Sequence, residues 1–192
     1  MIKKLSTKKD ELKKQKRNQW IIGGILIFVM VFSGFGMAVN SFGGDKDQEK
    51  VTYNGFEFYK QSSSWILPLE NFNLIFSHNP EETEGITNIN LTKLITDYQG
   101  QPLYIDSDYE LASYEIYQNI GNFVERIQPA CFEELNCQKD LPIKTCENNF
   151  IIIRKAEINS ITEEENCIFI EGDEENLLKL TDEFLYSIFG IK

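Results

Sequence analysis

Residues 20–39 read WIIGGILIFVMVFSGFGMAV, twenty residues without a charged side chain. At about 1.5 Å per residue, a helix of this length is about 30 Å long, which matches the hydrocarbon thickness of a lipid bilayer. Trp20 stands at one end, where an aromatic side chain anchors a helix at the membrane interface. We therefore expect residues 20–39 to form a transmembrane helix in contact with the lipid bilayer.

Two alternatives compete with a retained signal-anchor. A cleaved signal peptide would have an apolar core of about 7 to 15 residues before a small-residue site such as Gly36-Met37-Ala38. The uncharged stretch is longer than that, so a retained anchor is favoured. A core helix of a soluble domain is a second alternative, but such a helix normally has a polar face, and this segment has none.

The charges on the two sides of this segment have opposite signs. Residues 1–19 hold eight basic and two acidic residues, a net charge of +6, which leaves −17 for the remainder of a chain whose total is −11. Basic residues beside a first span keep that flank in the cytoplasm, where they also meet anionic lipids. We expect residues 1–19 to be a basic cytoplasmic arm in a single-pass protein of the cell membrane.

The rest of the chain is then extracytoplasmic. Residues 40–50 are polar with a Gly-Gly pair and are interpreted as a linker, and residues 51–192 are interpreted as one acidic domain. An acidic surface repels phosphate, so nucleic acid is not expected as a partner. Such a surface is compatible with cations or with a basic protein partner.

Alternating and helical patterns in residues 51–192 predict an α+β fold, a mostly antiparallel sheet packed with two helices. One helix is expected to start at the Ser107–Glu110 capping box, to bury Leu111 and to end near Pro129, and the other to start at Asp173 and end at Gly190. Pro68 argues for an edge strand. Strands are expected at 53–59, 65–69, 72–76, 86–91, 103–105, 150–153 and 167–170. Of these, 65–69 and 72–76 are expected to pair as a hairpin, and the first strands are expected to bury one aromatic face.

The four cysteines, Cys131, Cys137, Cys146 and Cys167, are predicted to form two disulfides. They lack the close pairs typical of zinc sites and the Cys-x-x-Cys motif of oxidoreductases. If 150–153 and 167–170 form an antiparallel hairpin, Cys146 and Cys167 are too far apart to bond, and Cys131 or Cys137 becomes the partner of Cys167. A Cys146–Cys167 bond would instead indicate parallel neighbours.

The sequence contains no recognisable catalytic, cofactor-binding or metal-binding constellation, and no such residue is predicted. His78, the only histidine, is interpreted as an exposed loop residue without a nucleophile motif beside it. Asn90, in Asn90-Leu91-Thr92, is a candidate glycosylation acceptor if the domain is exported. Two acidic clusters lack the spacing of a calcium-binding loop and are interpreted as solvated surface: Asp106, Asp108 and Glu110, and Glu163, Glu164 and Glu165.

The C-terminal part carries a resemblance to a known group of proteins. Its segments are Leu141-Pro-Ile-Lys-Thr-Cys146, Asn166-Cys-Ile-Phe-Ile-Glu-Gly172 and Leu185-Tyr-Ser-Ile-Phe-Gly-Ile191. With the basic arm and the single span, the chain resembles uncharacterised small single-pass membrane proteins of archaeal genomes. The resemblance implies an external, disulfide-bearing domain and no catalytic residue.

These observations favour a non-enzymatic, membrane-anchored interaction or accessory protein. One alternative is an envelope enzyme, a thiol-dependent or metal-assisted hydrolase that uses the cysteines or the acidic clusters. Another is an oligomeric membrane scaffold assembled through the glycine-bearing span, for example through Gly23 and Gly34.

Overall fold

The computed structural model describes residues 49–132, 137 and 140–192. The predicted arm, the predicted transmembrane helix and most of the predicted linker lie outside these residues. Within the described ranges, no helix has the length and apolar character needed to cross a membrane. Gln48–Lys192 forms one compact unit.

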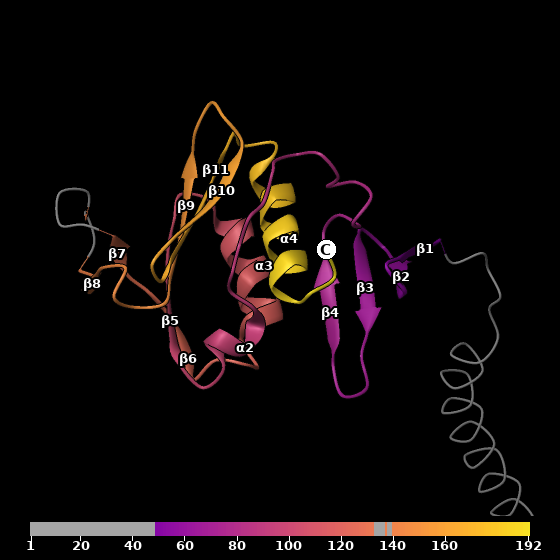
Figure 1. Ribbon diagram of the computed structural model, residues 1–192, viewed down its shortest axis with the longest axis horizontal. Coiled ribbons are helices and arrows are strands. Elements are labelled where there is room, and N and C mark those ends of the chain that lie inside the picture. Colours follow the sequence, from indigo (N-terminus) through magenta and orange to yellow (C-terminus); the bar gives the residue numbers. More distant parts are fainter. Residues whose placement is uncertain (1–48, 133–136, 138–139) are drawn as a thin grey trace, which may run out of the picture. The chain divides into compact units, whose positions relative to one another are not determined.

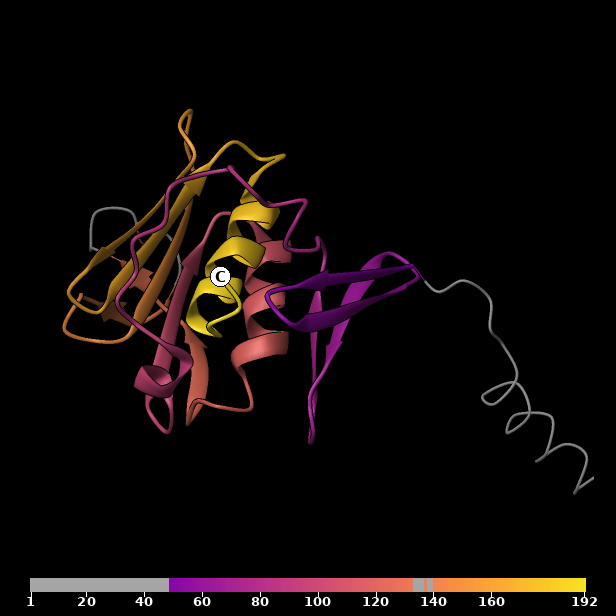
Figure 2. The ribbon, with the colours of Figure 1, turned by 45° about the vertical axis from the view of Figure 1, so that its right-hand side comes forward.

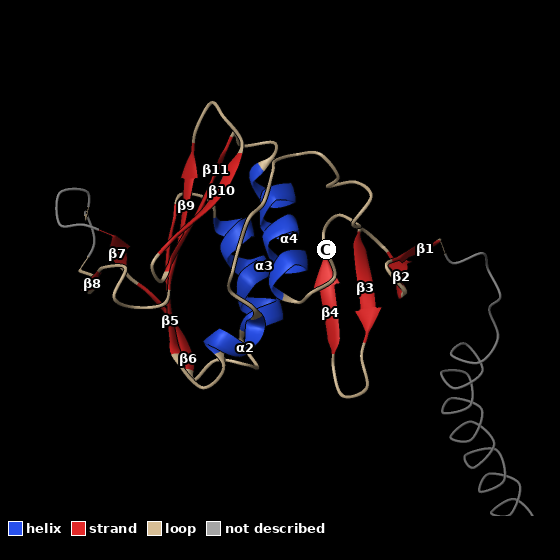
Figure 3. Cartoon of the chain, in the orientation of Figure 1, coloured by secondary structure: helices blue, strands red, loops and turns tan. Residues whose placement is uncertain are grey.

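The unit is built in layers, with two helices between two β-sheets (Figure 1). Helices α3 (Glu110–Ile120) and α4 (Leu177–Ile188) pack against each other. On one side they contact a five-stranded sheet, and on the other side α3 contacts a four-stranded sheet. A third, short helix, α2 (Ile95–Tyr98), lies in the connection between the sheets (Figure 3). The predicted α+β class is confirmed.

The four-stranded sheet is antiparallel throughout. Its strands, in spatial order, are β1 (Lys50–Tyr53), β2 (Phe56–Gln61), β3 (Ser64–Pro68) and β4 (Asn73–Phe76). The β3–β4 pairing confirms the hairpin expected from 65–69 and 72–76. Figure 2 shows the β1–β2 hairpin extending away from the helices.

Two expectations about this sheet were wrong. The strand expected at 53–59 is interrupted, because Asn54 (φ 45°) and Gly55 (φ 85°) form a tight turn between β1 and β2. Positive φ at both positions is typical of the Asn-Gly hairpin turn. Pro68 does not mark an edge strand, since β3 lies between β2 and β4; as the last residue of β3, it is tolerated at the end of the strand.

The five-stranded sheet is mixed. Its spatial order is β10 (Ser160–Glu164), β11 (Cys167–Gly172), β9 (Phe150–Lys155), β5 (Pro102–Ser107) and β6 (Arg126–Pro129), and only the β10–β11 pair is antiparallel.

The expected hairpin of 150–153 with 167–170 was therefore wrong. The intervening polar segment contains its own strand, β10, with Ile161 buried, and β10 forms the hairpin with β11. Strand β11 then returns beside β9 in parallel, with Cys167 opposite Phe150.

Helix α3 is shorter than expected, and one residue expected on its buried face is exposed. Its N-cap is Tyr109, and the Ser107 hydroxyl accepts the Tyr109 N–H (3.0 Å) instead of capping the first turn. The helix ends at Ile120, and the residues before Pro129 form β6. Leu111, expected in the core, is 56% exposed.

Two further expectations concern residues 86–91 and the two ends of helix α4. No strand forms at 86–91. Helix α4 begins at Leu177, after a turn in which the Asp173 carboxylate accepts the Asn176 N–H (2.9 Å). Gly190, with φ 68°, follows the last turn as expected.

The core lies on both sides of the helix layer. Aromatic side chains from the antiparallel sheet and α4 meet there, with Phe76 and Tyr186 ring centroids 4.5 Å apart. This confirms the buried aromatic face expected for the first strands. A second, smaller cluster around Phe150 covers the opposite face of the five-stranded sheet, beside the short parallel strands β7 (Cys131–Phe132) and β8 (Ile143–Lys144).

Candidate functional site: a cleft beside helix α3

A hollow of the described surface lies where β5 and β6 end and α3 begins. It has a volume of about 820 Å³. The carboxyl ends of parallel strands are a common place for a site, because the chain there turns into loops and helix starts that can hold functional side chains. The lining includes Asp106, Ser107, Asp108, Glu110, Ser113 and Tyr117.

The acidic side chains of this cleft differ in how closely they pair with a basic group. The Asp106 carboxylate binds Arg154 (Oδ2 to Nη2, 2.6 Å) and also accepts the Phe132 N–H (2.7 Å). Asp108 is farther from the same guanidinium, at 3.8 Å, and its side chain is 54% exposed. Glu110 is exposed at the start of α3. The mouth of the cleft therefore carries an excess of negative charge.

An apolar face of α3 borders the cleft. Leu111, Tyr114 and Tyr117 are 56%, 62% and 37% exposed, and their spacing of three residues places them along one face of the helix. We call these three residues the α3 face. Six large hydrophobic side chains of the described residues are exposed, and half of them lie on this one helix. Tyr117 also lines the cleft, so the two features are continuous.

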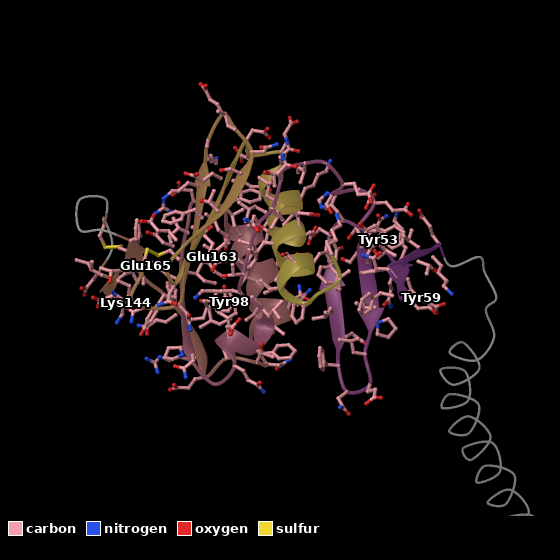
Figure 4. The ribbon with its side chains drawn as sticks, viewed as in Figure 1. Tyr53, Tyr59, Tyr98, Lys144, Glu163 and Glu165 are labelled. Carbon is pink, nitrogen blue, oxygen red and sulfur yellow. A yellow bond between two sulfur atoms is a disulfide. The ribbon has the colours of Figure 1, made fainter. Side chains whose placement is uncertain are left out.

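One of the disulfides borders the cleft, because Cys131 is among the residues that line it. Cys131 bonds to Cys137 and Cys146 bonds to Cys167, so two disulfides are present as predicted (Figure 4). The expected pairing of Cys131 or Cys137 with Cys167 was wrong. The reason is the parallel arrangement of β9 and β11, which brings Cys146, just before β9, beside the first residue of β11.

A second polar cluster is buried where β4 meets α3 and α4. The imidazole of His78 (Nδ1) and its backbone N–H each lie 2.9 Å from Asp182 Oδ2. The Ser77 backbone N–H donates to Glu115 Oε1 at 2.7 Å, and the Ser77 hydroxyl donates to Glu115 Oε2 at 3.2 Å. The Tyr186 hydroxyl donates to the His78 carbonyl. Residues from both α3 and α4 thus hold the end of β4.

Glu115 and Asp182, the carboxyl pair, are two buried acids that interact with each other. Asp182 is fully buried and Glu115 nearly so, and their side chains are within hydrogen-bonding reach of each other. Burial raises the pKa of Glu115 to about 8 and that of Asp182 to about 7. Asp182 Oδ1 has no hydrogen-bond partner among the described residues, and a buried carboxylate without full compensation favours its protonated form.

This cluster is suited to holding elements together rather than to nucleophilic catalysis. The Ser77 hydroxyl bonds to Glu115 and not to the imidazole, so it lacks the base that activates a serine nucleophile. Burial also lowers the pKa of His78, which favours its neutral form at pH 7.

Asn119 completes the same contact between α3 and β4. Its Oδ1 accepts the Ile75 N–H (2.8 Å) and its Nδ2 donates to the Ile75 carbonyl (2.7 Å). Strand β4 is at the edge of its sheet, and an edge strand presents unpaired backbone groups. The side-chain amide takes the place of a neighbouring strand.

The other residues singled out from the sequence have different surroundings. His78, expected to be an exposed loop residue, is half-buried against Asp182, so that expectation was wrong. Asn90 is exposed and borders a smaller hollow. Glu163, labelled in Figure 4, is not simply solvated: its carboxylate accepts hydrogen bonds from Thr92 N–H (2.7 Å) and Thr92 Oγ1 (2.5 Å).

Sequence reasoning missed the carboxyl pair and the α3 face. Glu115 and Asp182 are charged residues at positions of the helical repeat otherwise occupied by buried residues, and that conflict was the available signal. The α3 face was missed because Leu111 was assigned to the core.

Comparisons with known proteins add no relative to these observations: no protein-family model matches the chain, and neither do the curated proteins or the solved structures.

Proposed function

We propose that the protein is a membrane-anchored, extracytoplasmic interaction or accessory protein, and that the α3 face and the adjoining cleft bind its protein partner. The anchor in this proposal is residues 20–39, and the charge difference between residues 1–19 and the remainder supports the orientation. The non-enzymatic role rests on the surface described next.

The observation that carries the proposal is the concentration of exposed apolar side chains beside a hollow. Exposed hydrophobic residues scattered singly are ordinary, whereas a contiguous group indicates an interaction site. Tyrosine is also enriched at interface positions that contribute most to binding. The α3 face combines both properties with a cleft that Tyr117 shares.

The envelope enzyme stays a weaker candidate, since no observation favours it. A thiol-dependent enzyme requires a free thiolate, and all four cysteines are in disulfides. The oligomeric scaffold stays a prediction, because Gly23 and Gly34 lie outside the described residues. Replacing both by isoleucine and crosslinking the full chain in membranes would test it.

The proposed binding surface can be tested by photocrosslinking. The full chain carrying Tyr114→p-benzoylphenylalanine would be placed in native membrane vesicles and irradiated. We expect a discrete crosslinked product containing one other protein, because position 114 is the most exposed of the α3 face.

The matched control is Ile158→p-benzoylphenylalanine. Ile158 is 77% exposed but stands alone in the connection between β9 and β10. It should give no such product. Absence of a product at position 114, or the same products at both positions, would refute the proposal.

A further inference from the structure

We infer that the partner segment bound by the α3 face is a basic amphipathic helix, one that carries leucine-like side chains along one side and lysine or arginine residues beside them. This inference rests on the proposed function and names the chemistry of the partner. It is argued from the shape of the α3 face and from the charges around it.

The geometry favours a helical partner. Leu111 and Tyr117 are six residues apart on α3, which is about 9 Å along the helix axis. A partner helix can place its own side chains in the grooves between these exposed side chains, as two helices do when the ridges of one pack into the grooves of the other. Recognition of an amphipathic helix through anchors at this spacing is a recurring mode of peptide binding.

The charges favour a basic partner. Beyond the Asp106–Arg154 pair, the cleft mouth presents Asp108 and Glu110. The neighbouring Lys155 acts on Asp108 electrostatically, but its ammonium group pairs directly with Glu174 at 2.7 Å, so the acidic groups here still outnumber the basic ones. A lysine or arginine next to the apolar anchors of a partner would meet these carboxylates, which promotes encounter and excludes acidic partners. An anionic lipid surface is excluded by the same repulsion.

The size of the surface predicts modest affinity. With about 200 Å² per large side chain, the exposed parts of the three residues amount to on the order of 300 Å². This lies within the range of functional patches on single proteins but below the roughly 800 Å² per partner of a stable complex. Anchoring both proteins in one membrane would compensate by raising their effective concentration.

The probe is a fluorescent 15-residue peptide of leucine and lysine with leucine at helical spacing. Its binding to the full chain in phosphatidylcholine nanodiscs is measured by anisotropy, with empty nanodiscs as the lipid background. We expect saturable binding with micromolar Kd that weakens with salt. The double variant Tyr114→Ala, Tyr117→Ala should raise Kd at least tenfold, and Asp108→Asn with Glu110→Gln should reduce the salt dependence.

The control variant Ile158→Ala should leave Kd within twofold of the parent. Three results would overturn the inference. The first is equal binding of a peptide that has glutamate in place of lysine, and the second is unchanged peptide binding by the double tyrosine variant. The third is self-association of the chain through the α3 face in competition with the peptide. If the peptide fails while position 114 still crosslinks a membrane protein, the proposed function stands and only the partner chemistry is wrong.

Discussion

The raised pKa of Glu115 makes the stability of the domain depend on pH. The pKa of Glu115 rises from an ordinary value of 4.5 to about 8 because the side chain is buried. The folded chain therefore keeps a proton that the unfolded chain releases. The associated stabilisation is complete below about pH 4.5 and is lost as the pH rises toward 8.

The size of the change in the free energy of unfolding with pH follows from the binding of one proton. Each pH unit between the unfolded and folded pKa values changes the free energy of unfolding by about 1.4 kcal/mol, so stability should fall by about 4 kcal/mol between pH 5 and pH 8. We count the proton of Glu115 alone, because that is the titrating group that Glu115→Gln removes. Glu115→Gln replaces the acid by a neutral amide that can still accept the Ser77 N–H and donate to Asp182.

The assay is urea unfolding of the full chain in mild detergent at several pH values. In a Trp20→Phe background, the buried Trp65 is the fluorescent reporter. Glu115→Gln should flatten the pH dependence by about 1.4 kcal/mol per unit and be the more stable chain at pH 8. Glu110→Gln, the same change at an exposed position of α3, should leave the slope unchanged. Equal slopes for Glu115→Gln and the parent chain would refute the reasoning.

Three further predictions concern packing and crosslinks, each measured by urea unfolding. Asn119→Ala leaves the Ile75 N–H at the edge of β4 without its acceptor, while the Ile75 carbonyl keeps the amide of Gln118, and should cost about 2 kcal/mol; a loss below about 0.5 kcal/mol would contradict this role. Cys146→Ser should cost about 3 kcal/mol in the oxidised chain, with no difference once both chains are reduced. Gly172→Ala would place a Cβ 2.5 Å from Leu180 Cδ1 and should cost about 1 to 3 kcal/mol, so a neutral effect would show that Leu180 can move aside.

The sequence by itself determined features whose causes are local. Alternating apolar residues predicted the β3–β4 hairpin, and the helical repeat with Gly190 predicted the end of α4. The α+β class follows from the same patterns. The uncharged length of residues 20–39 and the charges beside it predict a membrane anchor for reasons that are equally local.

Only the tertiary structure decided which elements became neighbours. The sequence of Phe150–Lys155 and Cys167–Gly172 is compatible with either strand direction, and the insertion of β10 at the sheet edge made them parallel. That arrangement in turn decided the Cys146–Cys167 bond. Strand pairing depends on contacts between distant segments, which the pattern within one segment does not contain.

The same holds for burial on α3. Leu111 is exposed and Glu115 is buried because β4 packs against the polar side of the helix and presents its edge to Asn119. A charged residue is buried only where distant groups supply its hydrogen bonds, here Ser77 and Asp182. The cleft, the α3 face and the carboxyl pair therefore arise from contacts made only when the chain has folded.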